Sequence, residues 1–287
     1  MNSKRNGNLL EECSVKNLSS IASDIRLKIV DSIYNAHSGH PGGSLSIVEI
    51  VTYLYFHRMN INPEDPDDSK RDRFVLSKGH CAPTLYAALA IKGFFSEDEL
   101  NYLRKIKHML QGHPDKKHIP GIDMSSGSLG QGISAACGMA LASKKNGIDY
   151  DVYCVLGDGE LQEGQVWEAA MFAAHHKLNN LCAFVDYNNL QISGSISDVM
   201  SLGDIGQKFK SFGWEVLVIN GHDYYQIDKA WEAFSNNATQ PTVIVCNTVK
   251  GKGVSFMENN FYWHGNPPNE IEHKNAMEEL CNNIQLH

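Results

Sequence analysis

Residues Val152 to Gly194 read VYCVLGDGELQEGQVWEAAMFAAHHKLNNLCAFVDYNNLQISG, and this stretch decides the fold. It begins with an apolar run of strand length, continues with apolar residues at helical spacing, and reaches a second apolar run at Leu181–Val185. A strand, a helix and a second strand in this order form a right-handed βαβ unit with parallel strands. The alternation continues to Thr248, so we predict an α/β fold, a doubly wound and mostly parallel sheet with helices on both faces.

Polar residues follow both predicted strands of this unit. Asp158 comes directly after the first strand, and Asn188 follows the second. We expect the two side chains to share a site, because open α/β sheets bind ligands at the carboxyl ends of adjacent strands. A carboxylate, a carboxamide oxygen and the nearby carbonyl of Leu190 are hard oxygen ligands of the kind that Mg²⁺ prefers, together with phosphates and water. Gly159 allows a diphosphate to approach the backbone, and the helix that begins near Glu163 points its N–H groups toward it.

The composition predicts a globular cytoplasmic protein. The chain has 287 residues, of which 42% are hydrophobic and 9% aromatic, and this length fits one large domain or two small ones. The net charge of −8 argues against a general binder of nucleic acid or anionic membranes. Seven cysteines without a C-x-x-C motif, and the lack of an apolar signal or membrane-spanning run, indicate reduced thiols in the cytoplasm. No linker or repeat divides the chain, so we expect one domain over residues 1–287, with a frayed start over about residues 1–14.

One helix is predicted on each side of the loop HSGHPGG. An amphipathic helix covers Asn17–Ala36, and Ser44 is the predicted cap of a helix that runs through Arg58. The loop between them is stiffened by proline and holds His40 exposed, which favours a site over a core histidine. Further along, Phe95–Leu110 is predicted to be helical, because it is amphipathic and opens with a capping-box pattern.

Further glycine and histidine motifs follow. His80 ends the run SKGH after a short strand at Arg73–Ser77, where it suits either contact with an anion or a capping or core role. His113 repeats the Gly-His-Pro pattern. The loop SGSLGQG at 126–132 lacks the Gly-Lys-Ser/Thr of a nucleotide P-loop. It leads into a helix at Ile133–Lys144, whose small residues allow close packing.

Together these motifs resemble the transketolase family, specifically the N-terminal half that carries the thiamin diphosphate-binding fold. The resemblance runs from about Asn35 to His264 and rests on SGHPGG, SKGH, GHPD, SGSLGQG, GDGELQEG, the NN pair and a late His-Gly. GDG alone would occur as a turn in many α/β proteins, and only the combination is specific. Two positions depart from the usual family pattern. Ser128 stands where proline is usual, and GHPGGSLS is the form typical of split transketolases.

The resemblance implies which residues contact the cofactor. Asp158, Asn188 and the carbonyl of Leu190 match the ligands of Mg²⁺, for which Ca²⁺ or Mn²⁺ can substitute. Asp158 and Asn188 also count among the contacts of thiamin diphosphate. The other implied contacts of the cofactor are His80, Gly127, Ser128, Leu129, Gly157, Gly159, Glu160, Glu163, Ile192 and His264.

The resemblance also implies catalytic roles. His40, His113 and His264 match the histidines around the reacting carbons, where imidazoles can shuttle protons near neutral pH. Glu163 matches a glutamate in the carboxylate network that links two active sites, and Gly127 and Leu129 match positions that meet the aminopyrimidine across a subunit boundary. The carbanion chemistry belongs to the thiazolium of the cofactor.

The implied activity is the transfer of a two-carbon ketol unit from a ketose phosphate to an aldose phosphate. We expect a C-terminal partner chain with a pyrimidine-binding domain, most simply in an α₂β₂ complex, and activity only with that partner. Pentose phosphates of the pentose phosphate pathway are the default substrates. The alternatives are a component of a deoxyxylulose-phosphate synthase-like or 2-oxo acid dehydrogenase-like enzyme, which share GDG and NN, and a non-catalytic scaffold relative.

Overall fold

The βαβ unit predicted at the centre of the chain is present. In the computed structural model, which describes residues 10–284, it consists of β2 (Val152–Gly157), α6 (Gly164–His175) and β3 (Leu181–Tyr187). The two strands are parallel neighbours, with Val152 opposite Leu181. The unit lies within a five-stranded sheet of order β1-β2-β3-β7-β6, in which every neighbouring pair is parallel. The other strands are β1 (Arg73–Leu76), β6 (Glu215–Asn220) and β7 (Thr242–Asn247).

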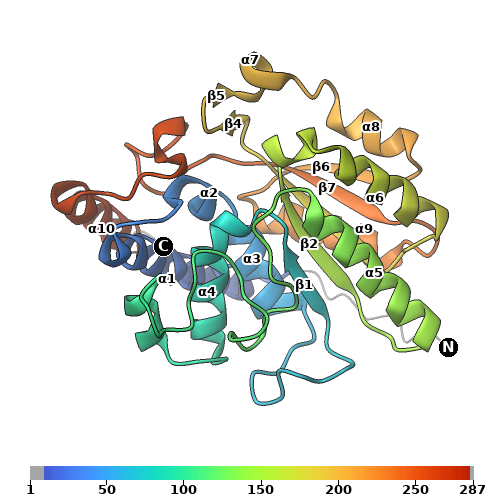
Figure 1. Cartoon of the computed structure of the whole chain (residues 1–287), viewed down its shortest axis with the longest axis horizontal. Helices are drawn as coiled ribbons and strands as arrows, with labels where there is room; N and C mark the ends of the chain where they lie inside the picture. Colours follow the sequence, from blue (N-terminus) through green and yellow to red (C-terminus); the bar gives the residue numbers. More distant parts are fainter. Residues whose placement is uncertain (1–9, 285–287) are drawn as a thin grey trace.

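Helices cover both faces of this sheet, as predicted (Figure 1). Successive residues of a strand point to opposite faces. In β2, Tyr153 and Val155 therefore join one hydrophobic core, whereas Cys154 and Leu156 join the other. The first core is closed by α1 (Glu12–Ala36), α3 (Val48–Tyr53), α4 (Ala82–Lys92) and α9 (Tyr224–Asn236), and the second by α5 (Gln131–Asn146), α6 and α8 (Ile205–Ser211).

The predicted helix over Phe95–Leu110 is wrong. Only a 3₁₀ helix, η3 (Glu97–Tyr102), forms there, with Ser96 as its cap. Arg104 and Lys107 then adopt positive φ angles of 61° and 73°, which a right-handed helix excludes. The backbone N–H of Arg104 donates to the carbonyl of Leu110 at 2.7 Å, so the chain closes into a turn instead of continuing the helix.

The helix after HSGHPGG begins earlier than predicted. α2 (Pro41–Ser46) starts directly after His40, and Ser44 lies inside this helix rather than at its cap. Pro41 suits the first helical position, where its missing N–H would have no partner in any case. A π-helical turn, η1 (Leu54–Arg58), extends α3 to the predicted end.

The chain ends also differ from the prediction. α1 begins at Glu12, so residues 12–14 are helical rather than frayed, and residues 1–9 of the predicted frayed start lie outside the described residues. After β5 (Gly194–Ser195) the chain forms α7 (Ile196–Met200) and then α8 (Ile205–Ser211). Within residues 10–284, no helix is long and apolar enough to cross a membrane.

The remaining elements are η2 (Gly79–Cys81), η4 (Gly159–Gln162), β4 (Leu190–Gln191), η5 (Phe261–His264) and α10 (Glu270–Ile284).

Candidate active site

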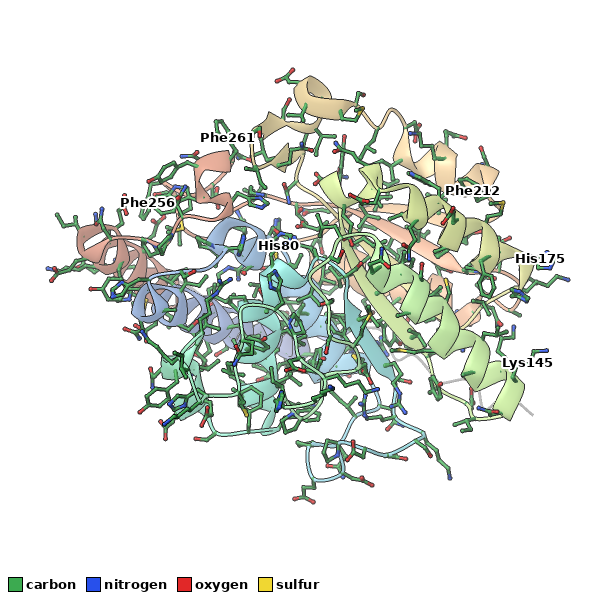
Figure 2. All side chains as sticks on the ribbon, viewed as in Figure 1. His80, Lys145, His175, Phe212, Phe256 and Phe261 are labelled. Carbon is green, nitrogen blue, oxygen red and sulfur yellow. The ribbon has the colours of Figure 1, made fainter. Side chains whose placement is uncertain are left out.

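A cavity of about 450 Å³ lies where the loops after β1, β2, β3 and β7 meet. His80, labelled in Figure 2 near the middle of the molecule, follows β1 and forms part of its wall. This is the carboxyl edge of the sheet, the edge at which the predicted ligand site belongs. The predicted site residues that line the cavity are His40, His80, Gly127, Leu129, Gly157, Asp158, Gly159, Glu160, Glu163, Asn188, Leu190, Ile192 and His264.

Two predicted site residues, His113 and Ser128, do not line this cavity. The ring of His113 instead lies against Gly127, whose φ of +145° and lack of a side chain allow this approach. A Cβ at Gly127 would meet the Cδ2 atom of His113 at 3.0 Å. His113 therefore packs against the glycine-rich loop, and its role at the reacting carbons stays a prediction.

Asp158 and Asn188 lie together at the ends of β2 and β3, as predicted. The carboxylate of Asp158 accepts backbone N–H groups from Gly159 at 2.7 Å and from Asn189 at 2.5 Å. Burial, followed by repulsion from the carboxylate of Asp186, raises the pKa of Asp158 to about 6. A cation beside Asp158 would reverse this shift, because it favours the charged form of the carboxyl group.

A second carboxylate fixes the orientation of Asn188. Asn188 Nδ2 donates to Asp186 Oδ2 at 3.0 Å, and Asn188 Oδ1 accepts the N–H of Leu190 at 3.1 Å. Residues 10–284 hold no cluster of three or more His, Cys, Asp or Glu side chains that could bind a metal by itself. A divalent ion here would rely on one carboxylate, one carboxamide oxygen and a backbone carbonyl, a donor set that suits Mg²⁺ shared with phosphate.

Asp186 belongs to a buried ion pair that sequence reasoning missed. It accepts from Lys78 and Thr248, and from Ser46 Oγ at 2.6 Å. Burial on its own would raise the pKa of Asp186, but the charge of Lys78 and these hydrogen bonds lower it below its usual range. The charged carboxylate therefore holds Lys78 and Asn188 in fixed positions in the wall of the cavity.

Three histidine rings meet at one wall of the cavity. The ring centroids of His40, His80 and His264 lie 5.1, 5.5 and 5.2 Å apart in pairs. Burial, with nearby cationic side chains as a further cause, lowers the pKa of His40 to about 4, that of His264 to about 3, and that of His80 well below its usual value. All three imidazoles are therefore neutral at pH 7, and His40 is half-buried rather than exposed as predicted.

Lys250 is a further wall residue that was not predicted. Its Nζ lies 3.1 Å from the carbonyl oxygen of Leu190 and 3.1 Å from Nδ1 of His264. It comes from the KGKG segment after β7, so the glycine-lysine repeat was the available signal. Burial, followed by the charge of Lys78, lowers the pKa of Lys250.

Glu160 holds three backbone segments of the site together. One carboxylate oxygen accepts from Ser77 Oγ and from the N–H of Gly130 at 2.9 Å, and the other accepts the N–H of Gly157 at 2.9 Å. These contacts join the end of β1, the glycine-rich loop and the GDG turn. Both oxygens already have protein partners, so the structure gives Glu160 a positioning role, and its predicted direct contact with the cofactor stays a prediction.

Glu163 and Ile192 lie at the mouth of the cavity and are exposed. Ile192 is 69% exposed. Glu163 precedes α6, and its side chain packs against Gly130, where an added Cβ would lie 2.8 Å from the Cβ of Glu163. Both side chains are open to contact from outside this chain.

Comparison with known proteins identifies some relatives of about the same length as this chain and others that are much longer. Residues 18–285 match the family described as "Transketolase, thiamine diphosphate binding domain". The chain is 41% identical to one of the subunits of the apulose-4-phosphate transketolase of Phocaeicola vulgatus, over 91% of this chain and 92% of that one. It is 45% identical to the 6-deoxy-6-sulfo-D-fructose transketolase subunit SqwG of a Clostridium species, over 90% of this chain and 94% of that one.

The longer relatives are matched over part of their length only. Human transketolase is 42% identical over 93% of this chain, which spans 42% of the human protein. The crystal structure of transketolase from Campylobacter jejuni superimposes with a TM-score of 0.87 at 36% identity, over 92% of this chain and 42% of that chain.

Proposed function

The chain belongs to the transketolase family, and we propose that it is the thiamin diphosphate-binding subunit of a two-chain transketolase. Together with its partner it transfers a two-carbon ketol unit from a ketose phosphate to an aldose phosphate. The observation that carries this proposal is the cavity in which Asp158, Asn188 and the Leu190 carbonyl face the same space as three neutral histidines. The transketolase matches favour this function over the deoxyxylulose-phosphate synthase-like and 2-oxo acid dehydrogenase-like alternatives.

The residues of the cavity fit a magnesium diphosphate. Lys250 is buried, and within residues 10–284 its ammonium group contacts a carbonyl and an imidazole but no carboxylate. A buried charge without a counter-ion is unfavourable, so an anion in the cavity would stabilise Lys250. Asp158, Asn188 and the Leu190 carbonyl would hold the Mg²⁺, and Lys250, His80 and Gly159 would hold the diphosphate.

The chain's own residues would move protons at the reacting end. When bound, thiamin diphosphate supplies the carbanion chemistry that breaks and makes the carbon–carbon bond of the sugar. His40 is half-buried and lines the cavity, where its imidazole would meet a substrate hydroxyl. His40 and His264 are unprotonated at neutral pH, so they would first accept a proton and later return it. Ile192 would keep water from the apolar part of the cofactor.

A partner chain would complete the site. Glu163 and Ile192 are exposed at the mouth of the cavity, where a pyrimidine-binding domain would cover them. Two relatives of the same length as this chain are named as subunits of transketolases. These observations support a C-terminal transketolase chain as the partner, in an α₂β₂ complex with two shared sites.

The names of the relatives bear on the substrate. One is named for apulose-4-phosphate and the other for 6-deoxy-6-sulfo-D-fructose, both sugars with an anionic group. We propose an anionic ketose as the donor, with pentose phosphates as the first substrates to assay. Residues 1–287 are proposed to form one cofactor-binding domain, which the family match over residues 18–285 supports. A cytoplasmic location is also proposed, supported by seven free cysteines.

Calorimetric titration of thiamin diphosphate into the chain mixed with its partner, with and without Mg²⁺, tests the proposed function. We expect saturable binding that requires Mg²⁺. Absence of binding under both conditions would contradict the proposal and would favour the scaffold alternative.

A further inference from the structure

His222 lies outside the cavity, in the turn between β6 and α9, but it contacts the loop that carries Lys250. The backbone N–H of Val249 donates to Nε2 of His222 at 2.9 Å. Because a backbone N–H can only donate, Nε2 is the unprotonated ring nitrogen and the proton is on Nδ1. Nδ1 lies 2.8 Å from Oε2 of Glu49, so His222 donates to that carboxylate.

Glu49 and Arg26 extend this contact to a second point of the loop. Arg26 Nη2 donates to Glu49 Oε1 at 2.5 Å, and Arg26 Nε donates to the carbonyl of Lys252 at 3.1 Å. The side chains of Arg26, Glu49 and His222 are only 10%, 10% and 12% exposed, so water competes little for these bonds. Burial would raise the pKa of Glu49, but Arg26 and the hydrogen bond from His222 outweigh it and hold the pKa at about 2. Glu49 is therefore a charged anchor at physiological pH.

Gly221 allows His222 to come within reach of the loop. A Cβ at this position would lie 2.6 Å from Cγ2 of Thr248 and 2.9 Å from the Cβ of Cys246, closer than real atoms approach. The N–H of Gly221 donates to the carbonyl of Asn247 at 2.9 Å. The turn after β6 therefore packs directly against Asn247, the last residue of β7, where the loop that carries Lys250 leaves the strand.

These contacts fix the loop on both sides of Lys250, at the Val249 N–H and the Lys252 carbonyl. The ammonium group between them reaches the Leu190 carbonyl and His264 across the cavity. We propose that His222, held by Glu49 and Arg26, is a positioning residue that presents Lys250 to the diphosphate. This inference rests on the proposed function, because it takes the anion in the cavity to be a diphosphate.

Two substitutions of His222 separate its two hydrogen bonds. In His222→Asn the amide nitrogen occupies the place of Nδ1 and keeps the bond to Glu49, but nothing reaches Val249. In His222→Gln the longer side chain places its oxygen near the former Nε2 and accepts from Val249, while the donor to Glu49 is lost. His175→Asn, at an exposed histidine at the edge of the molecule in Figure 2, is the matched control.

The test measures two quantities on the full chain, namely hydrogen exchange of the amides of residues 248–252 and the affinity for magnesium pyrophosphate. A hydrogen bond of ordinary strength predicts that His222→Asn speeds exchange at Val249 and weakens pyrophosphate binding by about fivefold each, and that His222→Gln restores most of both. Unchanged exchange in His222→Asn, or equal impairment in the two variants, would overturn the positioning role. Failure of the wild-type chain to bind magnesium pyrophosphate would instead contradict the proposed function, so the two failures are distinguishable.

Discussion

Asn188, which directly follows β3, donates from its carboxamide nitrogen to the carboxylate of Asp186 near the end of that strand, at 3.0 Å. Asp186 is itself fixed by Lys78, Ser46 and Thr248. This bond determines which atom of Asn188 is the oxygen, because only the nitrogen can donate to a carboxylate. The oxygen of Asn188 therefore faces away from Asp186, where it accepts the N–H of Leu190.

Removal of either proposed metal-binding side chain should strongly weaken Mg²⁺-dependent cofactor binding. In Asp158→Ala and Asn188→Ala, the octahedral shell of Mg²⁺ would lose one of its proposed oxygen ligands. We expect affinity for thiamin diphosphate to fall by about 100-fold in titrations with Mg²⁺. Asp149→Ala is the control, because this exposed carboxylate precedes β2, whereas Asp158 follows it. Unchanged affinity in Asp158→Ala or Asn188→Ala would remove the metal assignment.

The raised pKa of Asp158 predicts a pH dependence of stability. Its pKa is about 6 in the folded chain and about 3.9 when unfolded. At pH values between these two, the folded state therefore binds more protons than the unfolded state. Stability should therefore fall as the pH rises from 4 to 6, by an amount on the order of 2 kcal/mol, and then level off. Urea unfolding of the metal-free chain should show a steeper decline for the wild type than for Asp158→Asn. Identical pH dependence of the two proteins would refute the shift.

Glu160 and Glu163 should respond differently to the same substitution. Glu160→Gln places an amide N–H₂ against either Gly130 or Gly157, so one buried N–H loses its acceptor at a cost of about 1–3 kcal/mol. The side chain of Glu163 is exposed, so Glu163→Gln should leave the free energy of unfolding within about 0.5 kcal/mol of the wild type. Thermal unfolding of both variants checks this. A stable Glu160→Gln would mean that the three backbone segments are held by other contacts.

His113→Ala should lower turnover more than cofactor affinity. The predicted role of His113 is at the reacting carbons, and loss of a proton-transfer partner reduces the rate by about 100-fold. The structure places its ring against Gly127, so the variant could also loosen the glycine-rich loop. Measuring kcat and the cofactor Kd together distinguishes the two effects. An equal loss of both would assign His113 to the support of the loop rather than to proton transfer.

The parts of the site that follow directly after strands could be predicted from the sequence. The apolar runs before Asp158 and Asn188 identify β2 and β3, and their parallel pairing brings both residues to one sheet edge. Lys250 was missed because its position depends on β7 lying next to β3, although β6 precedes β7 in the chain. Strand order in an open sheet is set by long-range packing, which no local pattern records.

Helix prediction failed where a local signal was overridden. Ser96 does cap a helical turn, as its capping-box pattern indicates, but the turn ends at Tyr102. The two positive φ angles at Arg104 and Lys107 bring the chain back toward Gly112, whose carbonyl accepts from Arg104 at 3.4 Å. An amphipathic pattern cannot report a reversal that is fixed by such contacts.

Ketol transfer measured for the chain alone, for the partner chain alone and for their mixture tests the central claim most directly. All three assays contain Mg²⁺, thiamin diphosphate and a ketose phosphate donor with an aldose phosphate acceptor. We predict activity in the mixture only, because Glu163 and Ile192 are left open at the mouth of the cavity in the single chain. Robust ketol transfer by this chain alone would contradict the account.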